Sequence, residues 1–445
     1  MPKITHRKKR LSSFKLIVLG FAGVIVLGAL ILMLPFSSTA GVVTPFHEAL
    51  FTSTSAVCVT GLVVQDTGSY WSAFGQTVIL LLIQIGGLGV VTVAALFAML
   101  SGRKISLMQR STMQDAISAP KVGGIVRLTR FIVRGTFLIE LIGMIVMLPT
   151  FCGNYGIKGI WMAAFHSVSA FCNAGFDILG TAENKYPSLT GYIGNPAINI
   201  TIMLLIIVGG IGFLTWDDIY TNKWHFKKYR MQSKVILVTT AILIIAPAVF
   251  FFFCDFTGLP LAERILASLF QSVTPRTAGF NTADLPAMTG SSKAIMTLLM
   301  LVGGSPGSTA GGMKTTTLAV LILSAFSVCR KKDDAEVCGR RIDGSAVKNA
   351  AAVAVMYFLL FFVGGIVIST AEGLPLSTCL YETASAVGTV GLTLGITPQL
   401  GVLSQLILIV LMYLGRVGGL TLIYAAVSNK NHSGAKLPLE KITVG

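Results

Sequence analysis

Charged residues are scarce in this sequence. Only 12% of its 445 residues are Asp, Glu, Lys or Arg, about half the share found in a water-soluble domain, and 53% are hydrophobic. This composition excludes an ordinary soluble protein and predicts a membrane protein. Acidic residues are the rarest class, with 18 against 34 basic ones, so the net charge is +16. A positive charge of this size is typical either of a protein that binds nucleic acid or of the inner loops of a membrane protein, and the positions of the basic residues distinguish the two.

The chain also lacks the patterns of metal sites and enzyme active sites. Its seven cysteines include no C-x-x-C pair, and its five histidines have no i, i+4 spacing, so neither a disulfide framework nor a zinc site is predicted. H-E-x-x-H and paired carboxylates are missing too, which argues against an enzyme. Without a G-x-G-x-x-G motif opening a helix, no dinucleotide-binding domain and no organic cofactor is expected on this chain.

Eight apolar runs are long enough to cross a hydrocarbon layer roughly 30 Å thick. The first is about 22 residues long and no small-residue cleavage site follows it, so we expect a retained anchor and not a signal peptide. The sequence therefore predicts an all-α protein with eight transmembrane helices. These runs lie at about 14–35, 76–100, 131–151, 197–215, 235–256, 293–328, 349–371 and 402–427.

The basic residues fall between the apolar runs, and mainly on one side. If the N-terminus is cytoplasmic, the inner segments 1–15, 101–134, 216–234, 329–348 and the tail after 428 hold 27 of the 34 Lys and Arg residues. Outer segments then hold four. The positive-inside rule therefore predicts a multi-pass protein of the cell membrane with both termini in the cytoplasm. The positive charge is a topology signal with weak attraction to membrane lipid, and no nucleic acid is expected as a partner.

A short, moderately apolar segment recurs four times on the predicted outer side. The segments are 50–61, 164–175, 269–279 and 380–391, and each has an aromatic residue near its start, a run of Ser or Thr, and a final glycine. A helix with its own Gly-Gly pair follows each one. We predict four membrane-pore-membrane repeats around a pseudo-fourfold pore, with limits at 1–110, 111–230, 231–340 and 341–445.

Re-entrant loops of this kind suit an ion pathway. Irregular backbone is tolerated at membrane depth only where it is buried in protein or lines water, so four such loops imply an aqueous axis. A glycine permits the dihedral angles that turn consecutive carbonyls toward the axis, and a ring of carbonyls can replace the hydration shell of a potassium ion. One loop alone would be read as an ordinary connection; four matching loops favour a filter.

The sixth apolar run is interrupted by a polar, glycine-rich stretch through which we expect no helix to continue. Below a carbonyl filter, this stretch is best interpreted as a loop that lies across the pore and moves to open it; the alternative is a static kink. Its residues are Gly303, Gly304, Ser305, Pro306, Gly307, Ser308, Thr309, Ala310, Gly311, Gly312 and, beyond Met313, Lys314.

Two arginines lie in apolar or re-entrant surroundings. Arg416, on the last helix, either repels cations or holds the interrupted stretch through hydrogen bonds to its carbonyls. Arg276 is expected to support the third loop from behind through an ion pair with Glu382 or Asp284. Three acids that follow filter loops either concentrate cations at the mouth or are solvated: Asp66, Asp177 and Asp284.

With these residues in hand, the chain resembles the Trk/Ktr/HKT superfamily of potassium transporters, most closely the bacterial Ktr membrane subunits. The resemblance covers nearly the whole chain, and its marks are the four loop glycines, the interrupted stretch and Arg416. It implies potassium in the filter and uptake down the electrochemical gradient, with sodium dependence in some members. The filter positions carry over onto Val59, Thr60, Gly61, Asn173, Ala174, Gly175, Thr277, Ala278, Gly279, Thr389, Val390 and Gly391.

The resemblance also implies partners. It predicts a homodimer with one pore per subunit, with the C-terminal tail at the dimer contact, and a separate cytosolic regulatory ring that binds nucleotide. A competing hypothesis is a sodium- or proton-coupled potassium symporter that uses alternating access. Proton coupling would need a carboxylate at the membrane midplane, and Glu140 is the sole candidate.

Overall fold

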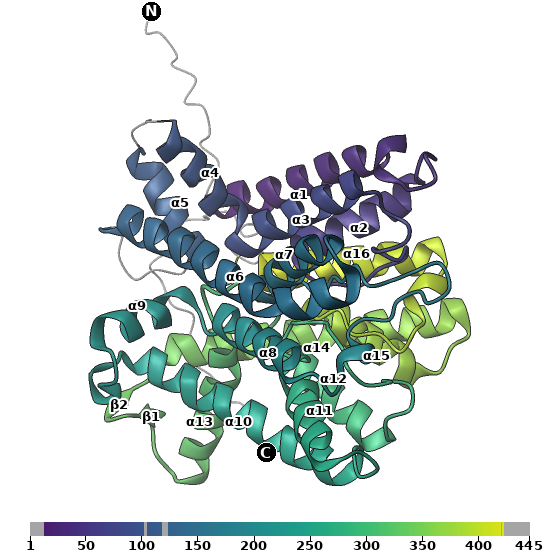
Figure 1. The fold of residues 1–445 in the computed structure, drawn as a ribbon. Coiled ribbons are helices and arrows are strands. Elements are labelled where there is room, and N and C mark those ends of the chain that lie inside the picture. Colours follow the sequence, from purple (N-terminus) through teal and green to yellow (C-terminus); the bar gives the residue numbers. More distant parts are fainter. Residues whose placement is uncertain (1–12, 102–104, 118–122, 420, 422–445) are drawn as a thin grey trace, which may run out of the picture.

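The computed structural model describes residues 13–101, 105–117, 123–419 and 421. It confirms an all-α architecture in four units, each with a first helix, a short helix and a second helix (Figure 1). The first helices are α1 (Ser13–Leu32), α6 (Ile125–Tyr155), α10 (Met231–Cys254) and α14 (Gly344–Glu372). The short helices are α2 (Phe46–Cys58), α7 (Lys158–Phe171), α11 (Leu261–Val273) and α15 (Leu376–Gly388). The second helices begin as α3 (Ala73–Leu88), α8 (Pro196–Gly210), α12 (Gly290–Leu301) and α16 (Val402–Val417).

The remaining elements lie at one end of the units, on the left of Figure 1. They are α4 (Val90–Leu100), α5 (Leu107–Ile117), α9 (Phe213–Asn222), α13 (Thr315–Cys329) and the antiparallel strands β1 (Glu336–Val337) and β2 (Arg340–Arg341). Single 3-10 turns occur at Pro35–Ser37, Thr190–Tyr192, Phe226–Lys228 and Thr397–Gln399. The predicted repeat limits at 110/111 and 340/341 fall within α5 and within the β1–β2 hairpin. The N-terminal basic segment up to residue 12 and the tail after 421 lie outside the described residues.

The first helices are the long, apolar ones, and all four are able to cross a membrane by length and composition. The second helices differ from the straight spans predicted from hydropathy. The expected helix at 76–100 consists of α3 and α4, bent by 96°, and the one at 197–215 continues from α8 into α9 with a bend of 98°. Each bend lies at a left-handed glycine, Gly89 with φ +84° or Gly212 with φ +91°. An apolar run shows how long a segment is but not where its direction changes.

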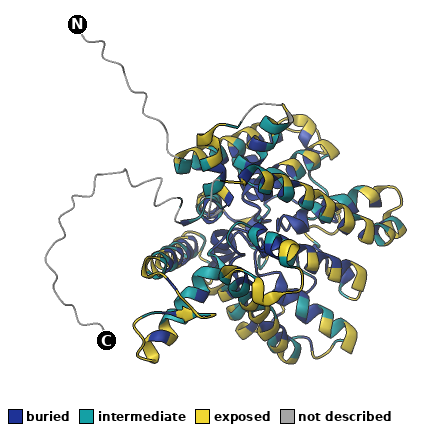
Figure 2. Cartoon of the chain, turned by 90° about the vertical axis from the view of Figure 1, so that its left-hand side faces the viewer, coloured by how far each residue is buried: buried dark blue, intermediate teal, exposed yellow. Residues whose placement is uncertain are grey.

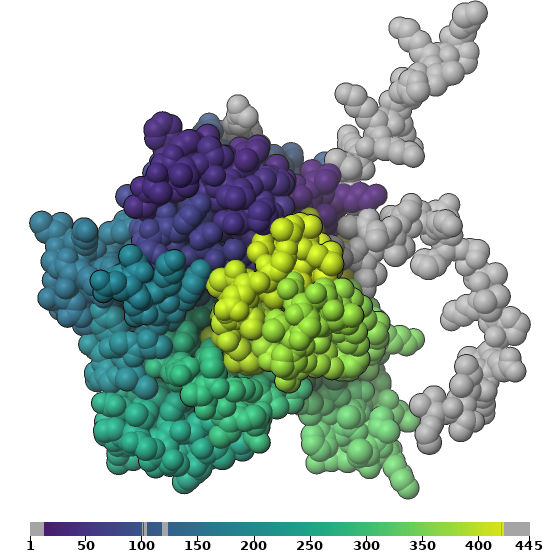
Figure 3. All heavy atoms as spheres, turned by 90° about the vertical axis from the view of Figure 1, so that its right-hand side faces the viewer, coloured from purple at the N-terminus to yellow at the C-terminus, as the bar shows by residue number. Residues whose placement is uncertain are grey.

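Each second helix packs on the short helix of the next unit: α3 on α7, α8 on α11, α12 on α15, and α16 back on α2. Three of them, α3, α8 and α16, also pack on the short helix of their own unit. The contacts therefore close into a ring, and Figure 3 shows the units in chain order around a common centre. Buried residues gather toward this centre and exposed ones toward the rim (Figure 2). Because the outer faces of α1, α6, α10 and α14 carry exposed Leu, Ile, Val and Phe side chains, they suit contact with lipid.

Glycines in three second helices allow the closest of these contacts. A methyl group on Gly86 would lie 2.2 Å from the carbonyl oxygen of Val57 in α2, and one on Gly209 would lie 2.1 Å from that of Phe171 in α7. Gly415 stands in the same relation to Val387. Small residues that let backbones approach are the usual means of helix packing in membranes.

We therefore predict that Gly86→Ala lowers the stability of the folded chain by about 1–3 kcal/mol, because the added methyl has no free volume. The measurement is thermal unfolding of the purified chain in detergent. Gly23→Ala is the matched control, since no atom lies within 4 Å of a methyl group at that helical position. Equal melting temperatures for the two variants would contradict the prediction.

Candidate cation filter and intramembrane loop

Each short helix is followed by one of the predicted filter triplets, 59–61, 173–175, 277–279 and 389–391, here called the filter segments. The triplet begins directly after α2 and α15, with one intervening residue after α7 and with three after α11. All twelve residues are buried, although the segments are not part of any helix or strand. The C-terminal ends of four helices thus meet at the segments, where their partial negative charge favours a cation.

The four filter segments have the same unusual backbone. The first residue of each is left-handed although none is glycine, with φ of 58° at Val59, 58° at Asn173, 70° at Thr277 and 53° at Thr389. The third residue, always glycine, is left-handed as well. In a regular extended chain successive carbonyls point to opposite sides, so inverting alternate residues brings them to one side. Three of the four first residues are β-branched, for which positive φ is costly, and such strain concentrates at functional sites.

The final glycines form a closed ring. A methyl group on Gly61 would lie 2.5 Å from the carbonyl oxygen of Ala174, and one on Gly175 would lie 2.7 Å from that of Ala278. The same relation continues from Gly279 to Val390 and from Gly391 back to Thr60, at 2.4 and 2.1 Å. Each segment thus faces the next around one axis, and only glycine leaves room for the neighbouring carbonyl.

Hydroxyl groups at the C-terminal ends of the short helices, or one residue beyond, hold the filter segments in place. Ser55 Oγ accepts a hydrogen bond from the Gly61 amide at 3.0 Å, and Ser385 Oγ accepts one from Gly391 at 3.0 Å. In the other two units the hydroxyl donates to a carbonyl just beyond the glycine, from Ser169 to Phe176 at 2.7 Å and from Thr274 to Phe280. Sequence reasoning assigned these residues no role, although a Ser or Thr five or six positions before every loop glycine is the signal that points to them.

A second set of hydroxyls fixes each short helix to its first helix. In every unit the acceptor is a backbone carbonyl of the first helix. Ser53 donates to that of Ile25 at 2.7 Å and Ser167 to that of Glu140 at 2.6 Å. Ser272 donates to the carbonyl of Ile244 at 2.5 Å and Thr383 to that of Phe361 at 3.1 Å. The Ser/Thr runs seen in the sequence therefore supply two kinds of anchor in every unit. These bonds also satisfy hydroxyls that would be costly to bury unpaired.

Three hydroxyls of the filter segments have no protein partner within the described ranges: those of Thr60, Thr277 and Thr389. All three side chains are fully buried. Buried polar atoms in native proteins are normally hydrogen-bonded, so unpaired oxygens beside inward-turned carbonyls suit a site for a desolvated cation.

The interrupted stretch crosses from one unit to others beneath the filter segments. It separates α12 from α13, and a methyl group on Gly311 would lie 2.2 Å from Thr389 Oγ1. Its backbone pairs with unit 2 through Ser305 N to Gly210 O at 2.9 Å, and with unit 4 through Gly312 N to Gly415 O at 3.2 Å. The stretch, called the intramembrane loop below, is thus irregular backbone with extensive hydrogen bonding.

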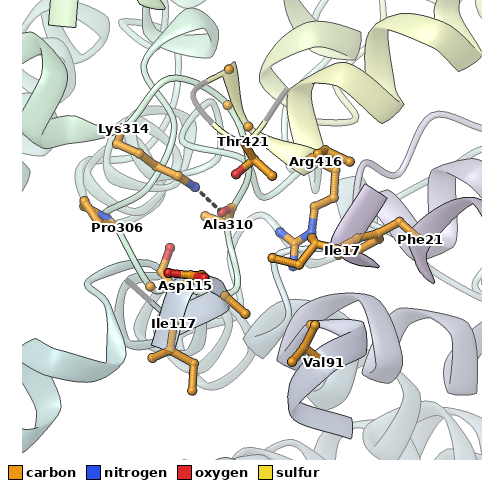
Figure 4. Close-up of a pocket in the computed structure, with 18 of the residues that line it drawn as sticks. Ile17, Phe21, Val91, Asp115, Ile117, Pro306, Ala310, Lys314, Arg416 and Thr421 are labelled. Carbon is orange, nitrogen blue, oxygen red and sulfur yellow. Dashed lines mark hydrogen bonds between the residues drawn. The ribbon is translucent and has the colours of Figure 1, made fainter. Parts of the chain in front are cut away.

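Arg416 reaches the intramembrane loop from α16. Its guanidinium donates to the Thr309 carbonyl of the loop and to the Gly86 carbonyl of α3. This geometry corresponds to the second of the two roles predicted for Arg416, holding the loop through its carbonyls. Lys314 folds back on the loop itself, with Nζ 2.8 Å from the Ala310 carbonyl oxygen (Figure 4).

Two cavities lie on either side of the filter segments and loop. The outer one, about 240 Å³, is lined by all four ring glycines together with Asp66 and Asp177. The inner one, about 310 Å³, is lined by Lys314, Arg416 and Asp115 of α5, among others (Figure 4). A path along the axis would therefore enter through an acidic mouth and meet the glycine ring before the loop.

The predicted ion pair of Arg276 is wrong. Within the described residues its guanidinium has no carboxylate partner, and it makes a weak hydrogen bond of 3.4 Å to Thr240 in α10. Glu382 instead accepts hydrogen bonds from Thr393, at 2.8 Å, and from Thr397. It anchors the segment that follows the fourth filter segment, so its charge is used within its own unit.

The three predicted mouth acids differ in their surroundings. Asp66 is buried and accepts from the Ser69 amide at 2.8 Å and the Tyr186 amide at 3.0 Å, so it links the outer loops of units 1 and 2. Asp177 is half-buried beside it, while Asp284 is exposed. Burial, and to a lesser degree the charge of Asp66, raises the pKa of Asp177 to about 7.

Fold and site together define a four-repeat membrane protein whose re-entrant segments converge on one axis. Residues 14–433 match the TrkH family, described as "Cation transport protein", and the chain belongs to this family. It is 39% identical to the "Potassium/sodium uptake protein NtpJ" of Enterococcus hirae, with 98% of each chain covered. It is 38% identical to the "Ktr system potassium uptake protein B" of Bacillus subtilis over 92% of each. The crystal structure of the potassium transporter TrkH from Vibrio parahaemolyticus shares the fold, with a TM-score of 0.75 at 18% identity, covering 96% of this chain and 87% of that one.

We predict that cation flux increases about twofold as the outer pH rises from about 6 to about 8. The Asp177 carboxyl is neutral below its pKa and negative above it, so the mouth attracts cations more strongly at higher pH. Asp177→Asn should abolish this increase in flux measured with vesicles. Asp284→Asn removes an exposed acid and should keep it; a pH profile that survives in Asp177→Asn would contradict the prediction.

Proposed function

We propose that this chain is the ion-translocating subunit of a potassium uptake system and conducts potassium through the four filter segments. One observation carries the proposal: the final glycines of the four filter segments form a closed ring, and each segment begins with a residue of positive φ. Such a ring directs backbone carbonyls to one axis, where they can replace the hydration shell of a cation. The printed names of the relatives, which include potassium and sodium uptake, agree with this substrate class.

The intramembrane loop is the proposed gate. It lies under the filter segments, and Arg416 ties it to α3 while its own backbone joins it to units 2 and 4. Four backbone hydrogen bonds join the loop to units 2 and 4, each worth only about 1 kcal/mol net, so a partner that shifts the inner helices can exchange them. We infer that the loop blocks the axis at rest and moves aside on activation.

We further propose cytoplasmic termini, a homodimer and a separate nucleotide-binding regulatory ring. Orientation follows from the basic residues of the inner segments. The relative called "Ktr system potassium uptake protein B" is by its name one component of a system. Such a system would serve potassium uptake during osmotic adaptation.

A coupled symporter is the second candidate, and buried Glu140 is the observation in its favour. Its carboxylate accepts from Gln84 at 3.3 Å and has no cationic partner among the described residues. However, it lies on α6 behind Cys172 and does not line either axial cavity. This position favours a structural carboxyl over a proton carrier on the ion path.

Tracer potassium flux into vesicles that contain this chain alone tests the proposal. Membrane potential, proton gradient and sodium gradient are set independently, and Glu140→Gln is measured beside the wild type. Flux that follows the potassium gradient and voltage, and that Glu140→Gln leaves unchanged, supports a pore. Flux that requires a proton or sodium gradient would contradict the pore hypothesis and support the symporter.

The ring geometry predicts that Gly61→Ser lowers the preference for potassium over sodium by about tenfold, equivalent to about 1.4 kcal/mol on one barrier. The new Cβ would lie 2.5 Å from the Ala174 carbonyl oxygen and push that ligand out of place. Competition of sodium with tracer potassium measures the preference. Gly191→Ser, in an outer loop with no atom within 4 Å of the new carbon, is the control. Unchanged competition in folded Gly61→Ser would refute the filter assignment.

Deleting residues 306–310 should raise the flux of the isolated chain several-fold, because the deletion removes the carbonyl that Arg416 holds and shortens the obstruction. Gel filtration reports whether the variant is folded, and sodium competition reports whether the filter is intact. Loss of flux in folded protein would show that the loop is needed for conduction and does not merely block it.

A further inference from the structure

A cluster of arginines lies at the inner end of α6 and has no assigned role. Arg127 and Arg130 are exposed on the first two turns of this helix, and Arg110 faces them from α5. Within the described part of the chain, none of the three side chains forms an ion pair or a hydrogen bond. Like charges placed together without carboxylates repel one another, so an anion bound between them would stabilise this arrangement.

The arginines line a groove made of two adjoining hollows. The first, about 390 Å³, is lined by Arg110, Arg127, Arg130 and the backbone at the uncapped start of α6, and the described residues place no carboxylate in its lining. The second, about 620 Å³, shares Arg127 and continues between α6 and α9. Together they form the headgroup groove, a name used below for both hollows.

The second hollow is amphipathic. Leu128, Phe131 and Leu214 give it an apolar wall, and the ring of Tyr220 packs on Phe131 with centroids 5.4 Å apart. Its carboxylate, Asp217, is paired with Arg230 at 2.9 Å, so it does not neutralise Arg127. A ligand that combines an anionic group with apolar chains matches this lining better than a free inorganic ion or a hydrophilic protein surface.

The depth of the groove in the membrane is set by the length of α6. Its 31 residues extend about 46 Å, which exceeds the roughly 30 Å hydrocarbon core. The 21 residues after Arg134 already span about 31 Å. With Tyr155 at the outer hydrocarbon boundary and α6 upright, Arg130 and Arg127 would lie about 6 and 10 Å beyond the inner boundary, in the layer that contains lipid phosphates. Tyr220 and Trp224, which are 74% and 97% exposed near the end of α9, are typical residues of this interface.

From charge, lining and depth, we infer that the headgroup groove binds an anionic phospholipid of the inner leaflet. Arg110, Arg127 and Arg130 bind the phosphate, for which guanidinium groups are geometrically suited, and the wall of Leu128, Phe131 and Leu214 contacts the acyl chains. The inference rests on the proposed orientation but not on ion conduction.

The test measures retention of labelled phosphatidylglycerol and labelled phosphatidylcholine by the full chain, purified in detergent and immobilised. We expect wild type to prefer phosphatidylglycerol, and Arg127→Gln with Arg130→Gln to weaken its binding roughly tenfold or more. The matched control is Arg330→Gln with Arg340→Gln, which removes the same charge from exposed inner positions outside the groove. Arg127→Lys with Arg130→Lys keeps the charge and should bind with intermediate affinity, which guards against misfolding of the Gln variant.

Several outcomes would overturn the inference. Equal retention of the two lipids excludes a site for anionic headgroups. Equal losses in the groove and control variants would mean diffuse attraction to a basic surface. Displacement of phosphatidylglycerol by millimolar inorganic phosphate would identify a site for free anions instead of lipid. Because no flux is measured, the lipid site and the proposed pore can fail separately.

Discussion

Backbone amides and carbonyls inside a membrane must find partners within the protein, and the architecture of this chain depends on that constraint. Four segments of irregular backbone lie at its centre, and each is held by a hydroxyl of the preceding short helix, as Ser55 and Ser385 hold Gly61 and Gly391. A second hydroxyl fixes every short helix to a long one. The second helices then close the ring, and glycines such as Gly86 permit the necessary approach.

The same constraint explains why the intramembrane loop can exist. Its backbone is satisfied by units 2 and 4, by Arg416 and by its own lysine, so a stretch without helix persists between α12 and α13. The filter segments satisfy the constraint differently. Among the described residues, no backbone amide donates a hydrogen bond to their carbonyls, and a desolvated cation would take that place. The proposed ligand thus completes the hydrogen-bonding pattern of the fold.

Much of this arrangement was predictable from the sequence, because the relevant features are spaced along the chain. Repetition of the loops at Gly61, Gly175, Gly279 and Gly391 indicated the four units, and the run from Gly303 to Gly312 indicated the break. The sharp bends at Gly89 and Gly212 could not be predicted, because the hydropathy of a segment does not indicate where its helix axis changes direction. The partner of Arg276 was also predicted wrongly: opposite charges in one sequence need not meet in space, and Glu382 is used by Thr393 and Thr397. The headgroup groove was not predicted either, because it is lined by residues of α5, α6 and α9, and no repeat in the sequence indicates that these helices meet.

One consequence follows from fusing four repeats into a single polypeptide. In a pore made of identical subunits, any obstruction occurs four times and intermediate degrees of opening are available. Here the intramembrane loop belongs to the third unit, between Leu301 and Thr315. With the loop as the proposed gate, a single element either crosses the axis or does not, which predicts two conductance levels per pore, and a substitution such as one at Gly311 would act once per pore instead of fourfold.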